Sequence, residues 1–146
     1  MTTVAEILKS KADPAVYAVV PTATVYEALR LMADKGIGSL LVKEGENIVG
    51  IFTERDYARK IALMGRASAQ TPVAEVMTDA VLFVHSSQNS EECMQLMTRK
   101  RLRHLPVVDE GKLVGLISIG DLVNNIISAQ QFTIEQLEHY IHGGSR

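Results

Sequence analysis

GIFTERD, residues 50–56, and GLISIGD, residues 115–121, are two versions of one pattern: glycine, two apolar residues, a hydroxyl residue, two further residues and aspartate. The two stretches begin 65 positions apart. In each, an apolar run leads into the S/T-x-x-E spacing of a helix capping box, with Asp in place of Glu. The pattern therefore predicts a strand-to-helix junction that occurs twice in the chain.

The repetition extends beyond these two stretches. When the chain is shifted by 65 residues, Glu27–Asp56 aligns with Glu92–Asp121 without a gap, and most unlike pairs keep their apolar character. VAEIL (4–8) also resembles VAEVM (73–77). A shared register of this length indicates an internal duplication. We predict one repeat with its leading segment over 1–66, a linker and second repeat over 67–128, and a terminal helix and tail over 129–146.

Each repeat shows the same order of elements. In the first, Thr24 is spaced to cap a helix that ends near Gly36, and two short apolar strands and a second helix follow. The second repeats this order. The expected helices are 25–35, 54–64, 90–100 and one from about 119, and the expected strands are 16–20, 39–43, 48–52, 81–84, 105–108 and 113–117. The fold class is thus mixed α/β.

Three further local expectations concern the helices. Tyr57, Ile61 and Met64 are spaced to share one buried face. Thr71 and Pro72 suit the cap and first position of a short helix in the linker. Thr133 begins a capping-box spacing that predicts a separate terminal helix.

The composition limits the classes of function. The chain has 146 residues, is 47% hydrophobic and carries a net charge of −2 with a pI near 6.1, which argues against a nucleic-acid binder. No apolar run reaches the length of a membrane span, and no signal peptide is evident, so a cytoplasmic protein is expected. Cys93 is the single cysteine, which excludes an internal disulfide, and its place on a helix stripe predicts a buried residue.

The repeated phrase has two interpretations. It can be only a helix cap. It can also hold a nucleotide, because a helix N-terminus offers backbone N–H groups to a phosphate and a nearby carboxylate can accept hydrogen bonds from ribose hydroxyls. The glycine before the apolar pair indicates close approach by another group.

The order V-P-x-x-T-V-x-E-A-L and G-I-F-T-x-R-D, followed by R-H-L-P-V-V-D and G-L-I-S-x-x-D, resembles a tandem pair of CBS (cystathionine-β-synthase) domains, a Bateman module, over residues 4–128. The resemblance implies two β-α-β-β-α repeats packed sheet to sheet with pseudo-twofold symmetry. It also implies a non-catalytic regulatory protein that binds AMP, ADP, ATP, NAD(H) or S-adenosylmethionine in clefts between the repeats, with no metal required.

The resemblance also implies which residues bind the ligand. Asp121 and Asp56 would bind ribose, Ser118 and Thr53 would touch ribose or phosphate, and Arg103 and Arg55 would reach phosphate. Each cleft would be closed by the leading segment of the opposite repeat. The Asp121 site would add Ala12, Val16, Tyr17, Ala18, His104, Leu105 and Pro106, and the Asp56 site would add Gly38, Ser39, Leu40, Thr78 and Val81.

Other motifs have weaker interpretations. The basic run 99–104 fits a helix C-terminus, where cations offset the dipole, and the alternative is a nucleic-acid patch. His139 and His142 are spaced for a metal but lack a third ligand. No nucleotide-binding glycine loop or catalytic triad is present, so we expect no enzyme.

The function expected from the sequence is therefore ligand sensing. The module would bind an adenine nucleotide and signal through a homodimer or an effector protein. The alternative is an interaction or scaffold subunit whose clefts bind nothing.

Overall fold

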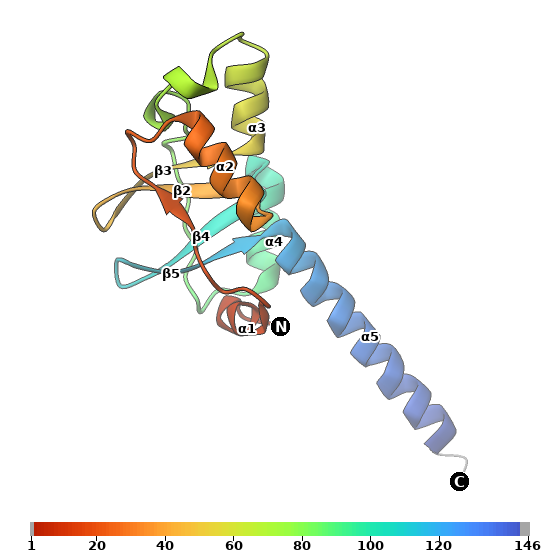
Figure 1. Cartoon of the computed structure of the whole chain (residues 1–146). Coiled ribbons are helices and arrows are strands. Elements are labelled where there is room, and N and C mark those ends of the chain that lie inside the picture. The colour runs from red at the N-terminus through yellow and green to blue at the C-terminus, as the bar shows by residue number, and fades with distance from the viewer. Residues whose placement is uncertain (1, 144–146) are drawn as a thin grey trace. The chain divides into compact units, whose positions relative to one another are not determined.

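The computed structural model describes residues 2–143, with side chains as far as residue 141. The chain forms two compact units (Figure 1). The continuous unit is Ala15–Leu82, and the discontinuous unit joins the N-terminal segment up to Pro14 with the chain from Phe83 onward. The units therefore differ from the stretches 1–66 and 67–128 of the duplication, because each repeat packs with the leading segment of the other.

The continuous unit is built on a three-stranded sheet. Strand β1 (Ala18–Val19) pairs in parallel with β2 (Ser39–Glu44), which pairs antiparallel with β3 (Asn47–Thr53). Helix α2 (Val25–Lys35) precedes β2, and α3 (Glu54–Tyr57) follows β3 and continues into the π-helical turn η1 (Ala58–Ala62). Two short 3₁₀ turns, η2 (Ser68–Gln70) and η3 (Val73–Glu75), complete the unit.

Helix α2 follows the signals in its sequence. The Thr24 side chain accepts a hydrogen bond from the Glu27 N–H, and Gly36 ends the helix in the left-handed region at φ 66°. Val25, Ala28 and Met32 are buried, as their spacing predicts. The apolar stripe and the two caps therefore fix both the limits of this helix and its buried face.

Two expectations for the continuous unit are wrong. Met64 is 70% exposed and does not share the buried face of Ile61, because the π-helical turn changes the spacing of the side chains after Tyr57. Thr71 does not cap the linker helix. Its hydroxyl donates to the Ala67 carbonyl, and only the 3₁₀ turn η3 follows Pro72.

In its described residues, the discontinuous unit contains a hairpin and three helices. Helix α1 (Val4–Ser10) lies beside the hairpin of β4 (His104–Asp109) and β5 (Lys112–Ser118), with α4 (Ser90–Lys100) and the long α5 (Ile119–Gly143) (Figure 1). The strand expected over 81–84 is reduced to a single bridge between Val84 and Val107.

Helix α5 is continuous, so the expectation of a separate terminal helix beginning at Thr133 is wrong. The Thr133 hydroxyl donates to the Ala129 carbonyl at 3.0 Å, as a threonine does inside a helix. The stretch 122–132 contains no glycine or proline that would end the helix. No described helix has the length and apolar content needed to cross a bilayer.

The exchanged leading segments fill the two cores. Val4 and Ile7 of α1 are buried in the core of the discontinuous unit, and Val73 and Val76 occupy the corresponding core of the continuous unit. Cys93 lies in the core of the discontinuous unit, and its equivalent Ala28 lies in the core of the continuous unit. The prediction that Cys93 is a buried residue is confirmed. The leading segments are therefore structural parts of the units that receive them.

The glycines of the repeated phrase are the points of contact. A Cβ atom on Gly115 would lie 2.7 Å from Cδ2 of Leu8, and one on Gly50 would meet the Met77 side chain and the Thr78 carbonyl. Real Cβ atoms do not approach so closely, so an alanine at either position would require Leu8 or Met77 to shift. The predicted close approach is confirmed, and the approaching group is a leading segment of the chain itself.

Candidate functional site: two capped aspartates

Both phrases form a complete capping box. The Thr53 N–H donates to Asp56 Oδ2 at 3.0 Å, and the Asp56 N–H donates to Thr53 Oγ1 at 3.1 Å. The Ser118 N–H donates to Asp121 Oδ2 at 2.9 Å, and the Asp121 N–H donates to Ser118 Oγ at 3.1 Å. The capping role predicted for both aspartates is confirmed, and a ligand role has to coexist with it.

Asp56 has further partners on both oxygens. Oδ2 also accepts from Thr53 Oγ1 at 3.2 Å, and Oδ1 accepts from Thr78 Oγ1 at 3.1 Å and lies 3.2 Å from Lys60 Nζ. The residue is 7% exposed. Its carboxylate is therefore neutralised and largely enclosed by its own unit.

Asp121 is held differently. Lys11, at the end of α1, places Nζ 3.0 Å from Asp121 Oδ2 and 2.7 Å from the carbonyl oxygen of Leu116. The carbonyl of Ile51, at the equivalent position in the first repeat, instead accepts from the Thr78 N–H at 2.9 Å. Lys11 thus contacts both the strand carbonyl and the aspartate carboxylate. In the other unit, Thr78 and Lys60 contact the equivalent two groups. Both the Ser118 N–H and Lys11 contact the same oxygen of Asp121, Oδ2.

The start of β4 adds basic groups beside Asp121. His104 is opposite Ser118 in the strand register, and the Arg103 carbonyl accepts from the Ile119 N–H at 2.8 Å. Burial lowers the pKa of His104; Lys11 and Arg103 lower it further, whereas Asp121 opposes them. The imidazole is therefore neutral at pH 7, and the cationic groups of this site are Lys11 and Arg103.

The corresponding corner of the continuous unit carries more negative charge. Gly38 occupies the position equivalent to Arg103, and its carbonyl accepts from the Glu54 N–H at 3.1 Å. The Glu54 side chain lies against Gly38, with Oε1 3.2 Å from where a glycine Cβ would be. Asp56 and Glu54 thus balance Lys60 and Arg55, so an anion gains less here than beside Asp121.

The structure brings most of the predicted site residues together within single units. Those of the Asp56 site all lie in the continuous unit: Gly38, Ser39, Leu40, Thr53, Arg55, Asp56, Thr78 and Val81. Most residues of the Asp121 site lie in the discontinuous unit: Ala12, Arg103, His104, Leu105, Pro106, Ser118 and Asp121. The other three, Val16, Tyr17 and Ala18, lie in the continuous unit. The assignment of these last three to the Asp121 site stays a prediction, as does every ligand contact.

Sequence reasoning missed the two lysines. Lys60 follows Asp56 by one helical turn, a spacing that brings oppositely charged side chains together on a helix, so its role was recognisable. Lys11 precedes Asp121 by 110 positions, and no local pattern connects them. Only the packing of α1 against β5 shows that Lys11 belongs to this site.

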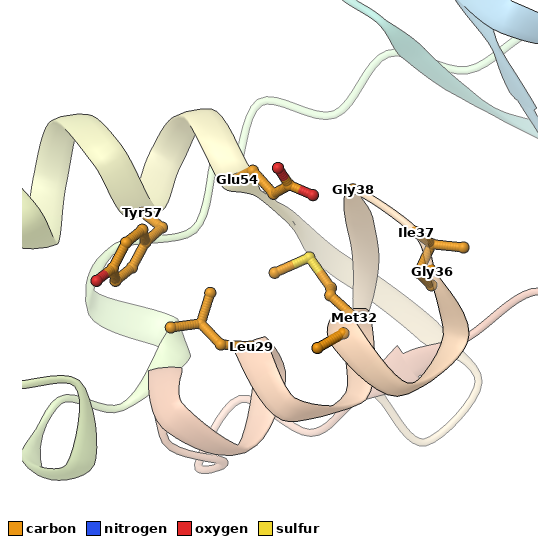
Figure 2. A pocket seen from close by; sticks show the side chains of 8 residues that line it. Leu29, Met32, Gly36, Ile37, Gly38, Glu54 and Tyr57 are labelled. Carbon is orange, nitrogen blue, oxygen red and sulfur yellow. The ribbon is translucent and has the colours of Figure 1, made fainter.

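A hollow lies between α2 and α3 on the continuous unit (Figure 2). Leu29 and Met32 of α2 and Tyr57 of α3 contribute apolar walls, and Glu54 contributes the single charged side chain. Apart from Gly38, the residues predicted to bind a ligand do not line it. Its apolar lining suits contact with another apolar surface.

The described residues include no group of three or more His, Cys, Asp or Glu side chains that could hold a metal. Of the two histidines spaced for a metal, the His142 side chain lies outside the described part. Burial and the neighbouring Glu92 raise the pKa of the Cys93 thiol, which keeps it protonated and unreactive.

Comparisons with known proteins match both halves of the chain. A family model described as CBS domain matches residues 4–63 and 73–128. The CBS domain-containing protein CBSX3, mitochondrial, of Arabidopsis thaliana is 37% identical over 151 residues, covering 98% of this chain and 73% of the relative.

Two solved structures are informative. A putative signal-transduction protein with CBS domains from Burkholderia ambifaria has a TM-score of 0.86 and 58% identity, covering 91% of this chain and 99% of that one. The structure of CBSX2 in complex with AMP has a TM-score of 0.72 and 26% identity, covering 89% and 99%. The predicted fold class, a mixed α/β tandem of two such domains, is confirmed.

Proposed function

Because the chain belongs to the CBS-domain family, with two such domains in tandem, we propose that it is a non-enzymatic regulatory module that binds an adenosine-containing ligand. The observation that carries the proposal is the group around Asp121. There the Asp121 carboxylate, the N-terminus of α5 and the cations Lys11 and Arg103 lie in one corner. The AMP complex of the relative CBSX2 supports the same ligand class.

The geometry favours a phosphorylated ligand at Asp121. Ribose hydroxyls would donate to the carboxylate, and the phosphate would lie near Lys11 and Arg103. The phosphorylated candidates are AMP, ADP, ATP and NAD(H); S-adenosylmethionine has no phosphate and would make only the ribose contacts. We propose that the Asp121 site fills first, because the Asp56 carboxylate already has partners on both oxygens and Glu54 lies beside it.

Calorimetric titration with these compounds tests the proposal. A ligand at a hundred times its Kd should raise the free energy of unfolding by about 2.7 kcal/mol. AMP should bind more tightly than adenosine, which has the same ribose and base but no phosphate. The absence of binding by every adenosine compound would contradict the proposal.

Substitution separates the ligand role of Asp121 from its capping role. Asp121→Ala should weaken ligand binding at least tenfold and lower the free energy of unfolding by only about 1 kcal/mol, the usual effect of a lost cap. Asp56→Ala is the matched control, because it removes the equivalent cap and should leave the first binding event largely unchanged. If Asp121→Ala lowers stability but leaves affinity intact, Asp121 is a cap only.

A scaffold subunit whose sites bind nothing is the second candidate. The enclosure of Asp56 favours it, because every partner of that carboxylate has a structural role within the unit. This candidate predicts that no nucleotide changes the melting temperature and that both alanine variants reduce stability only, Asp56→Ala at least as much as Asp121→Ala.

The signal would pass through a homodimer or an effector protein, without nucleic acid or a membrane as partner. The apolar hollow between α2 and α3 supports self-association (Figure 2). Light scattering at several concentrations, with and without nucleotide, measures it. We propose a cytoplasmic location; the Arabidopsis relative carries the word mitochondrial in its name, so cell fractionation is the appropriate check.

A further inference from the structure

The second half of α5 exposes its apolar side chains. Every described side chain from Ile127 to Ile141 is exposed, and in Figure 1 this part of the helix runs away from β4 and β5. Ile127, Ile134, Leu137 and Ile141 are 57, 48, 58 and 66% exposed. A helix of this length has marginal stability alone in water, so its apolar side chains need a partner.

Most of the exposed apolar residues follow a heptad, and Phe132 and Tyr140, 62 and 80% exposed, lie outside it. Isoleucine recurs every seven residues, at 127, 134 and 141. Val123 lies four residues before the first isoleucine, and Gln130 and Leu137 lie three residues after the first and second. These are the a and d positions of a coiled coil, with Ile at three successive a positions and Leu or Val at two of three d positions. That combination favours a two-stranded parallel coiled coil.

We propose that α5 pairs in parallel with α5 of a second copy of this chain. A sequence with Ile at a and Leu at d is complementary to itself. In a parallel pair, Gln130 lies opposite Gln130 of the second copy, where the two amides can form hydrogen bonds; an offset or antiparallel pair would bury the amide against Ile or Leu. Gln130 therefore selects both direction and register.

The charges along the helix agree with self-pairing. At the positions that flank the seam, Glu138 is the single charged residue, and the heptad rule places it opposite Thr133 of the second copy. No like charges meet across the seam. A lipid surface is a poorer occupant, because α5 contains no Lys or Arg and carries Asp121, Glu135 and Glu138, whereas interfacial helices are rich in cations.

Cysteine cross-linking of the full chain tests the pairing. Gln130→Cys and Leu137→Cys place a thiol at two d positions, where the Cα atoms of a parallel pair come within the roughly 7 Å limit of a disulfide. Gln136→Cys is the matched control, because it adds a thiol one residue away on the outer side of the helix. The buried Cys93 is present in all three variants.

Under mild oxidation, both d-position variants should convert mostly to disulfide-linked dimers, and Gln136→Cys should convert at most one-fifth as much. Adding Ile134→Lys to Leu137→Cys should abolish the cross-link. Equal cross-linking of the three variants, cross-linking at only one d position, or none at either would overturn the proposal. The proposal would also be overturned if the wild-type chain floated with phosphatidylcholine–phosphatidylserine vesicles and Ile134→Lys abolished that flotation.

The inference specifies one interface of the proposed homodimer, and the two can fail separately. Light scattering on Ile134→Lys reports whether the chain still dimerises through another surface, such as the α2–α3 hollow. A dimer without the d-position cross-links would leave the proposed homodimer standing and refute the α5 pairing. A monomeric wild-type chain would refute both.

Discussion

Arg101 occupies a backbone position that suits glycine. It follows α4 with φ 56°, in the left-handed region, and its equivalent at the end of α2 is Gly36, with φ 66°. A side chain at such a φ carries a conformational cost that glycine does not. The two repeats thus use the same helix end with different residues, and the second repeat is strained here.

Arg101→Gly should therefore be more stable than Arg101→Ala by about 1 kcal/mol, because both remove the side chain and only glycine relieves the backbone. Urea unfolding of the two variants measures the difference. Gly36→Ala is the reverse experiment: no atom lies within 4 Å of its would-be Cβ, so any loss reflects backbone strain alone. Equal stability of Arg101→Gly and Arg101→Ala would show that the position tolerates a side chain.

His104 should make folding sensitive to acid. Its pKa in the folded chain lies below the ordinary value of 6.5, mainly because of burial. As the pH falls below about 6.5, the unfolded chain takes up a proton at this residue before the folded chain does, so the free energy of unfolding decreases. His104→Gln should lose part of that decrease. Thermal melts between about pH 8 and 5 measure it, with pH 8 as the internal reference, and an unchanged slope would contradict the assignment.

At the scale of elements, the glycine in each phrase allows a leading segment to pack on a strand. The Gly115 side of β5 contacts Leu8 of α1, and the Gly50 side of β3 contacts Met77. Leu8 and Met77 are the final residues of VAEIL and VAEVM, so the two contacts are equivalent in the duplication. The repeated phrase and the repeated leading segment therefore form one packing unit in each half of the duplication.

Gly115→Ala should lower the free energy of unfolding by about 1–3 kcal/mol, the usual effect of an added methyl group in a filled core. Leu8→Ala in the same chain should recover part of that loss, because it removes the atoms that the new Cβ would meet. Gly120→Ala is the control, since its Cβ would meet Ser118 Oγ at an ordinary 3.6 Å. Additive losses in the double variant, measured by chemical unfolding, would contradict the contact.

At the scale of the whole molecule, the exchange of leading segments ties each half of the sequence to the other. Val4 and Val73 are equivalent residues, both fully buried, and each lies in the core of the opposite repeat. A change near the N-terminus therefore acts on strands a hundred residues away. The same exchange places Lys11 beside Asp121, so the stability of α1 and the charge of the candidate site are linked.

Val4→Ala should weaken β4 and β5, and Val73→Ala should weaken β2 and β3. Each should cost about 1.5–3 kcal/mol from lost burial and the remaining cavity. Amide hydrogen exchange of the two variants locates the loss, and each serves as the control for the other. If Val4→Ala accelerated exchange in β2 and β3 instead, the division into exchanged units would be wrong.

The sequence alone determined the duplication, the order of helices and strands, and the two capping boxes. These follow from local signals: Thr24 and Gly36 act within one helical turn, and the alternation of strands and helices is read from neighbouring residues. It did not reveal that α5 is one helix, because a Thr133 capping-box spacing is equally compatible with a helix interior. It also misplaced Met64, because no signal announced the π-helical turn.

Only the tertiary structure decided which partner each aspartate has. Asp56 and Asp121 share a motif, a cap and a strand register, yet one carboxylate contacts Thr78 and Lys60 and the other is paired with Lys11. The difference arises because α1 comes from the far end of the chain, and contacts of that separation follow from packing rather than from local sequence. The two halves are thus alike as sequences and different as candidate sites.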